Sequence, residues 1–231
     1  MLEVLRHMSP WLVWLLFAAE NFLIMIGVLA VGNVLQRQPR RQMFAYSRRQ
    51  WSIALMTCAI NTVITWIGYE AWLMGVILIS TDVSWRIFTD ALALFLAMDL
   101  LMYLFHYLIH QHAFLYKTLH RLHHEATDPV PIDLFILHPL ETLSFGALWL
   151  ILLLPFRLNI YGIIIYLVIN VFFGMMGHLG MEPIPENIRR WPGMQYLGTS
   201  AFHHGHHRHE AYNYGFYTTI WDRLFRTLRK V

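Results

Sequence analysis

Residues 158–181 read LNIYGIIIYLVINVFFGMMGHLGM and contain no Asp, Glu, Lys or Arg. An apolar run of this length can cross the hydrocarbon core of a membrane as a helix. Residues 51–69, WSIALMTCAINTVITWIGY, form a second uncharged run that approaches the same length. These two stretches predict a polytopic membrane protein.

The composition of the whole chain points the same way. Of the 231 residues, 57% are hydrophobic and only 13% are charged, about half the usual charged fraction. A water-soluble surface cannot be built from so few charged side chains, and disordered, collagen-like and nucleic-acid-binding classes are excluded.

The net charge of +3 does not indicate nucleic acid, because basic residues gather in one loop between apolar runs: Arg37, Arg40, Arg41, Arg48 and Arg49. Such a loop is typical of a cytoplasmic segment beside anionic lipid.

Five hydrophobic runs cover residues 11–35, 51–79, 87–110, 142–154 and 158–177. The fourth run is short for a full span, so it and the fifth are expected to form a shallow hairpin. Glu20 and Asn21, inside the first run, are expected either to face the bundle interior or to make a helix-packing hydrogen bond. We therefore predict an all-α, polytopic integral membrane bundle of about four to five helices or half-helices.

The distribution of positive charge predicts the orientation of this bundle. If the basic loop is cytoplasmic and each run crosses once, the only Lys or Arg residues left outside are Arg6, Arg86 and Arg157. The N-terminus is then outside, and the histidine-rich segments form a cytoplasmic helical cap. The small size and the absence of sorting signals favour a prokaryotic inner (plasma) membrane.

The histidines carry the chemistry of this sequence, because all of the 14 except His7 lie between residues 106 and 209. His106 and His110 are four residues apart and share one helical face. The spacing i, i+3, i+4 occurs twice, at His120, His123 and His124 and again at His203, His206 and His207. Imidazoles crowded at a membrane interface repel one another when protonated and lose solvation when neutral, whereas a divalent cation satisfies the neutral form. The pattern predicts a metal site.

Two more histidines are candidate ligands, each with an acidic residue nearby. His178 is followed at i+4 by Glu182, which is either a ligand or a supporting carboxylate. His138 precedes Pro139, which suits a first helical position, so His138 is either a helix cap or a ligand. Asp99, two turns before His106, is expected to accept a ring N–H from a ligand histidine. The turn at Asn213 is expected to close the site, to line a substrate entrance or to be a plain turn.

So many histidines exceed what one ion can bind, which argues for two metals. The single cysteine, Cys58, rules out a cysteine-rich metal site. Imidazole suits iron, zinc and copper alike, so the ligand type does not decide the metal. The chain has no glycine-rich dinucleotide motif, no cysteine cluster for iron–sulfur and no haem domain; a redox reaction would therefore need electrons from another protein, such as a ferredoxin or a cytochrome with its reductase.

The order and spacing of these motifs resemble the fatty acid hydroxylase and sterol desaturase superfamily of membrane di-iron oxygenases. The similarity covers roughly residues 95–228 and rests on DLLMY at 99–103 before His106, HRLHH at 120–124, LHPLE at 137–141, GHLGME at 177–182, the last histidine motif at 203–207, NYG at 213–215 and IWDRLF at 220–225. His204 departs from the pattern, since the family more often has an acidic residue there. The division expected is N-terminal membrane helices with the basic loop in 1–95 and a catalytic domain in 96–231.

The resemblance implies two non-haem irons held by His106, His110, His120, His123, His124, His178, His203, His206 and His207, with His138 as a further candidate. It implies that O2 is the co-substrate and that a lipid taken from the bilayer is hydroxylated. Desaturation by the same centre is the main alternative, because both reactions begin with hydrogen abstraction. A membrane metal-binding or transport protein is a third reading, but it would require polar groups along the spans, whereas these histidines lie at the span ends.

Overall fold

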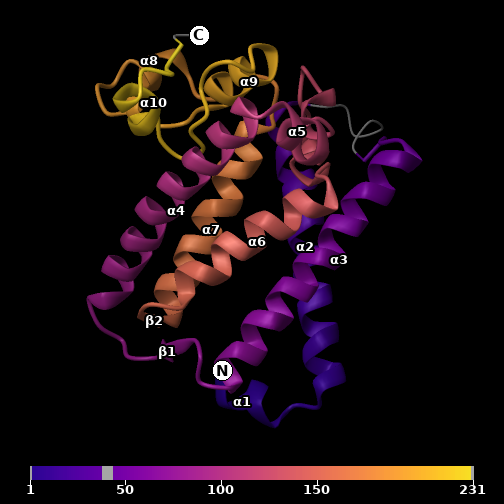
Figure 1. Ribbon diagram of the computed structural model, residues 1–231, viewed down its shortest axis with the longest axis vertical. Coiled ribbons are helices and arrows are strands. Elements are labelled where there is room, and N and C mark those ends of the chain that lie inside the picture. The colour runs from indigo at the N-terminus through magenta and orange to yellow at the C-terminus, as the bar shows by residue number, and fades with distance from the viewer. Residues whose placement is uncertain (1, 38–43, 230–231) are drawn as a thin grey trace.

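Five long apolar helices make up the body of the protein, as the computed structural model of residues 2–37 and 44–229 shows (Figure 1). They are α2 (Pro10–Leu35), α3 (Arg48–Leu73), α4 (Arg86–Gln111), α6 (Pro139–Leu153) and α7 (Ile160–Gly177). Each agrees with one of the predicted hydrophobic runs to within a few residues, apart from the tail of the second run. Of the basic loop, Arg40 and Arg41 lie outside the described residues.

The shorter elements lie at the two ends of these helices. At one end, beside the C-terminus, are α5 (Ala113–Leu115), the π-turn η1 (Tyr116–His120), the 3-10 turns η2 (His123–Glu125), η3 (Pro131–Phe135) and η4 (Met194–Tyr196), α8 (Glu186–Arg189), α9 (Ser200–Arg208) and α10 (Ile220–Leu224) (Figure 1). We call this end the cap. At the other end lie α1 (Leu2–His7), β1 (Leu78–Ser80) and β2 (Arg157–Asn159) (Figure 1). The predicted helical membrane bundle with a histidine-rich cap is confirmed.

A short parallel strand pair departs from the predicted all-helical chain, as does an isolated antiparallel bridge between Leu197 and Thr218. Leu78 pairs with Arg157 and Ser80 with Asn159. The hydrogen bonds of the strand pair join the loop before α4 to the loop before α7, so the two connections at this end are held together. The sequence does not predict strands only three residues long, because such a segment carries no periodic signal.

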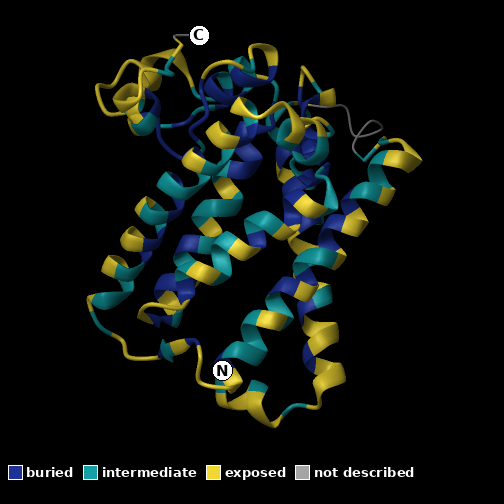
Figure 2. Cartoon of the chain, viewed as in Figure 1, coloured by how far each residue is buried: buried dark blue, intermediate teal, exposed yellow. Residues whose placement is uncertain are grey.

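Four of the long helices, α2, α3, α4 and α7, are long and apolar enough to cross a membrane. Exposed residues occur along the long helices (Figure 2). Large apolar side chains, such as Leu23 and Val168, are among them, as expected for surfaces in contact with lipid rather than water. Helix α6 has 15 residues and measures about 22 Å at 1.5 Å per residue, less than the ~30 Å hydrocarbon core. The protein is a multi-pass membrane protein.

Local signals at the start of each helix explain where α6 and α7 begin. His138 is the N-cap of α6, its Nδ1 accepts a hydrogen bond from the Leu140 N–H, and Pro139 occupies the first turn. Asn159 caps α7 by accepting from the Tyr161 N–H at 2.9 Å. Both caps satisfy N–H groups that have no partner inside the helix.

The middle of α2 differs from the sequence expectation. Asn21 Nδ2 donates to the Phe17 carbonyl of the same helix at 2.9 Å. Glu20 is exposed on the outer surface of α2, so the prediction that it faces the bundle interior is wrong. Helical periodicity alone could not separate the two faces here, because apolar residues surround the whole helix.

Two buried carboxylates hold the C-terminal part of the cap, Asp99 from α4 and Asp222 from α10. Asp99, fully buried, accepts hydrogen bonds from the Tyr217 N–H at 2.9 Å, the Thr218 N–H at 3.1 Å and the Trp221 indole N–H at 2.9 Å. Asp222, equally buried, accepts from the Tyr214 N–H at 2.8 Å and the Gly215 N–H at 2.7 Å. These bonds offset the cost of burying each charge.

Replacing Asp99 by Ala should therefore unfold the cap at lower temperature. The change leaves several buried N–H groups without an acceptor, each at a cost of about 1–3 kcal/mol. Thermal unfolding of detergent-purified protein would measure the loss of stability, with Asp82→Ala, in the exposed loop before α4, as the matched control. Equal melting temperatures for the two variants would contradict this role.

Candidate metal centre

Nine histidines converge in the cap, in two adjoining groups. The five-histidine group consists of His106, His110, His120, His124 and His206, and the four-histidine group of His123, His178, His203 and His207. Within each group the candidate ligand atoms lie within 4.8 Å of one another. The rings of His124 and His207, one from each group, are only 4.7 Å apart between centroids. The structure thus places two potential metal positions side by side.

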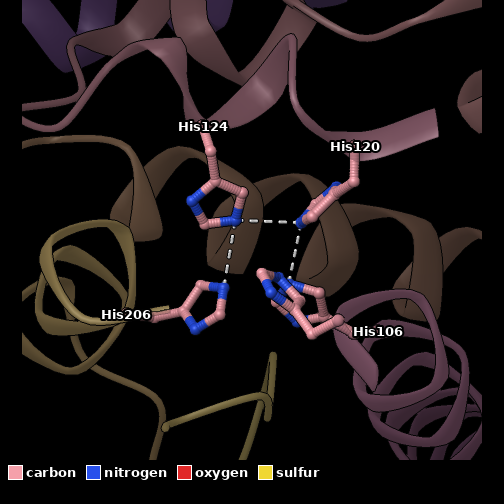
Figure 3. Close-up of side chains that lie close together, drawn as sticks. His106, His120, His124 and His206 are labelled. Atoms are coloured by element: carbon pink, nitrogen blue, oxygen red, sulfur yellow. Dashed lines mark hydrogen bonds between the residues drawn. The ribbon is translucent and has the colours of Figure 1, made fainter. Parts of the chain in front are cut away.

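Each group draws on segments far apart in the sequence. Four members of the five-histidine group are drawn in Figure 3, where rings from α4, η1, η2 and α9 point toward one another. The four-histidine group receives His178 from the C-cap of α7 and its other members from η2 and α9. Helix α9 supplies both groups, since His203 and His207 turn to one and His206 to the other.

The segment from His120 to His124 also divides between the groups. His120 and His124 join the five-histidine group, and His123 joins the other. The chain forms a π-turn up to His120 and a 3-10 turn from His123. The division does not depend on these turns, because the regular helix α9 divides in the same way, with positions i and i+4 in one group and i+3 in the other. Irregular turns of this kind often occur at functional sites.

Backbone carbonyls fix the ring orientation of four histidines. The Nδ1–H of His106 donates to the Tyr214 carbonyl at 2.9 Å, and that of His206 to the Tyr212 carbonyl at 2.7 Å. His178 and His207 are held in the same way, by the carbonyls of Gly174 and Ala126, both at 2.8 Å. A carbonyl can only accept, so the proton lies on Nδ1 and the Nε2 of each neutral ring carries a free lone pair.

The sequence analysis missed Glu141, which plays the same part for His120. This carboxylate is fully buried and hydrogen-bonds to the Nδ1 of His120. The bond again leaves Nε2 of His120 free to bind a metal. The Pro139 signal could have found Glu141, because it places the start of α6, and therefore Glu141, beside the histidines.

The free lone pairs face one another at short distance. The Nε2 atoms of His106 and His120 are 2.9 Å apart, and those of His206 and His124 are 3.2 Å apart (Figure 3). Between His106 and His120 neither Nε2 has a proton to donate, because each ring's N–H is engaged at Nδ1. Two facing lone pairs repel, and a cation between them removes that repulsion. This contact is therefore that of two metal ligands and not of a hydrogen bond.

Burial keeps the rings in the form that binds metal. It lowers the pKa of His203 and His206 well below the ordinary histidine value, and nearby imidazoles lower the pKa of both rings further. Burial also lowers the pKa of His207 to about 3, with His178 adding to the effect. The rings are neutral near pH 7, as metal coordination requires.

Four of the predicted site residues, Asn213 among them, lie outside both groups, as does His204. His138 caps α6, and Asp99 holds the backbone at Tyr217 and Thr218 rather than a histidine ring. The carboxylate of Glu182 accepts from the Ala201 N–H at 3.1 Å, in the first turn of α9, and so supports the helix that carries His203, His206 and His207. His204, expected outside the site, pairs with Asp128 at 2.8 Å.

Asn213 acts on the site through its neighbours. It has a left-handed backbone, with φ of 62°, and it lies between the two residues whose carbonyls hold His106 and His206. Its N–H donates to the Thr227 carbonyl at 2.9 Å, and its Oδ1 accepts from the Arg229 N–H at 2.7 Å. Of the roles considered for this turn, closing the histidine site fits these contacts best.

The fold and the site together define a multi-pass membrane protein with a histidine-lined candidate metal centre in its cap. Residues 91–227 match the family model described as "Fatty acid hydroxylase". The chain belongs to the fatty acid hydroxylase family. The matched region contains all nine converging histidines together with Asp99, Glu141 and Asp222.

Curated relatives carry several different names. The chain is 31% identical over 140 residues to a very-long-chain aldehyde decarbonylase of Oryza sativa subsp. indica, covering 58% of this chain and 22% of that protein. It is 30% identical over 129 residues to the lathosterol oxidase of Mus musculus, covering 54% and 40%. It is 32% identical over 125 residues to a methylsterol monooxygenase of Danio rerio, covering 54% and 42%. The chain thus spans less than half the length of each of these relatives, and no solved structure matches it.

One substitution in each group tests whether two ions bind separately. Metal analysis of protein purified from iron-supplied cells should find about two ions per wild-type chain and about one in His206→Ala or His203→Ala, because each change removes one buried ligand. His204→Ala is the matched control, since His204 neighbours His203 but belongs to neither group, and it should retain both ions. A full complement of metal in His206→Ala and His203→Ala would refute the assignment.

Proposed function

We propose that this protein hydroxylates a membrane lipid with O2 at a centre of two irons. The observation that carries the proposal is the convergence of nine imidazoles in two adjoining groups, with five of the rings held at Nδ1 so that their Nε2 atoms are free to bind metal. Membership of the fatty acid hydroxylase family supports the reaction class. The names of the relatives imply different reactions, so the mass-spectrometry experiment described below is needed to identify the substrate and the product.

The donor set fits two metal ions. Ligands about 2.1 Å from one ion and at right angles lie about 3.0 Å from each other, and the Nε2 contacts among the five-histidine group measure 2.9–3.2 Å. Imidazole nitrogen suits iron, zinc and copper. Iron is proposed because oxidation of an unactivated C–H bond needs a redox metal, whereas zinc acts only as a Lewis acid. When bound, the two irons would supply the electron transfer to O2.

The reaction balances with an external reductant. One O2, two electrons and two protons convert R–H into R–OH and one water. The electrons would come from a ferredoxin or from a cytochrome with its reductase. Within this chain, Glu141 and the backbone carbonyls hold the ring protons at Nδ1, and the buried position of the rings keeps bulk water away from the centre.

The cap is proposed to face the cytoplasm. Arg6, Arg86 and Arg157 lie at the end opposite the cap, beside α1, β1 and β2, whereas Arg48, Lys117 and the basic residues from 189 to 229 lie at the cap end (Figure 1). An excess of Lys and Arg marks the cytoplasmic side of a membrane protein. This side is also where a soluble electron donor is available.

A groove between α2 and α7 is proposed to hold the hydrocarbon chain of the substrate. It has a volume of about 260 Å³ and is lined only by apolar residues: Ile24, Gly27, Val28, Val31, Val168, Val171, Phe172 and Met175. Both helices are candidate membrane spans, so the groove opens toward lipid. Met175, at its cap end, is one turn before His178 of the four-histidine group. An apolar chain is the occupant that matches this lining.

Filling the groove should weaken substrate use without disturbing the metals. A Cβ at Gly27 meets no atom within 4 Å, so Gly27→Leu places its side chain in open space and α2 can remain intact. We expect a several-fold higher KM for a long-chain lipid with unchanged metal content. Ala19→Leu, which adds the same bulk on an exposed part of α2 outside the groove, is the control. If both variants have the wild-type KM, the groove does not bind the hydrocarbon chain of the substrate.

Lipid mass spectrometry tests the proposed reaction directly. Cells expressing the wild type should accumulate a lipid heavier by one oxygen, and cells expressing an inactive variant, His120→Ala, should not. A product lighter by two hydrogens would instead establish desaturation. If the two lipid profiles are identical while the protein binds metal, the reading as a metal-binding or transport protein replaces the enzyme.

A further inference from the structure

The two histidine groups differ in whether carboxylates lie beside their Nδ1 atoms. Carbonyls hold two rings of each group: His106 and His206 in the five-histidine group, and His178 and His207 in the four-histidine group. The five-histidine group has two carboxylates in addition: Glu141 hydrogen-bonds to His120, and Glu210 Oε1 lies 3.7 Å from Nδ1 of His124. Within the described part of the chain, the buried Nδ1 atoms of His123, His124 and His203 have no hydrogen-bond partner.

Glu210 is well placed to act on His124. It follows the C-cap of α9, the helix that carries His206, and its carboxylate also interacts with the Tyr116 hydroxyl. The Tyr116 ring lies 5.3 Å from His110 and 6.0 Å from His124, between centroids. Glu210 therefore lies between a tyrosine packed against the group and one of its imidazoles. A shortening of about 1 Å would turn the contact with His124 into a hydrogen bond.

This difference matters because a ligand histidine responds to what holds its far nitrogen. A carboxylate on Nδ1–H raises the basicity of Nε2, fixes the ring and adds negative charge near the cation. A neutral carbonyl fixes the ring but adds no charge. A ring with an unpartnered N–H is less well fixed, and burying that N–H is itself unfavourable.

We infer that Glu210 is a positioning residue for His124 and that it, with Glu141, makes the five-histidine group the tighter of two unequal metal sites. The inference rests on the metal centre of the proposed function and assigns the order in which its positions fill. The five-histidine site takes the first divalent cation and the four-histidine site the second. The two sites are unequal because of their surroundings as well as their number of histidines.

Titration of metal-free, detergent-purified protein with Co²⁺, followed by visible absorption, tests this order. The wild type should bind two equivalents with distinct affinities. Glu210→Gln should weaken the tight equivalent about 10- to 100-fold and leave the weak one unchanged, whereas Glu210→Asp, which keeps the charge, should recover part of the loss. Glu186→Gln is the matched control, because Glu186 is exposed and pairs with Arg190 away from the histidines.

Two group variants identify which site is which. His206→Ala should abolish the tight equivalent and His203→Ala the weak one. The unchanged weak equivalent in Glu210→Gln also shows that this variant is folded. Equal affinities in the wild type, or an unaltered tight equivalent in Glu210→Gln, would overturn the inference. Its failure is distinct from that of the proposed function, which is read from lipid products and not from Co²⁺ binding.

Discussion

A neutral imidazole has one N–H, and the position of that proton determines what the cap can do. In this protein carbonyls at Tyr214, Tyr212, Gly174 and Ala126 and the carboxylate of Glu141 engage the proton at Nδ1. Each such bond aims a lone pair at a shared point. Lone pairs that converge without protons are stable only around cations, so the metal centre is a consequence of where these acceptors lie.

The rest of the fold keeps those acceptors in place. Tyr212 and Tyr214 belong to a loop outside the helices and strands, and its position depends on Asp222 of α10 and on Asn213. Asp99, buried in α4, ties the following stretch to the membrane bundle. Asp99, which the histidine pattern suggests as a partner of a metal ligand, therefore acts at a distance: it holds the stretch that follows the loop whose carbonyls hold the rings.

Much of this arrangement follows from the sequence, because apolar length and i, i+4 spacing are local signals. The five long helices and the nine candidate ligand histidines could be predicted from such local signals. The distribution of histidines between two groups could not, since it depends on how the segment 120–124 and helix α9 pack against α4 and α7. Glu141 was missed because its contact with His120 joins residues 21 apart. Glu20 was misplaced because an all-apolar helix gives no sign of which face packs inward.

The bonds at Asn213 also constrain how the protein is made. This turn is held by the Thr227 carbonyl and the Arg229 N–H, which a ribosome adds long after Gly177, the end of α7. Until those residues are made, the carbonyls that orient His106 and His206 lack their support, whereas the carbonyls of Gly174 and Ala126, which orient His178 and His207, are already present. The five-histidine group is therefore the later of the two to reach its final order during synthesis.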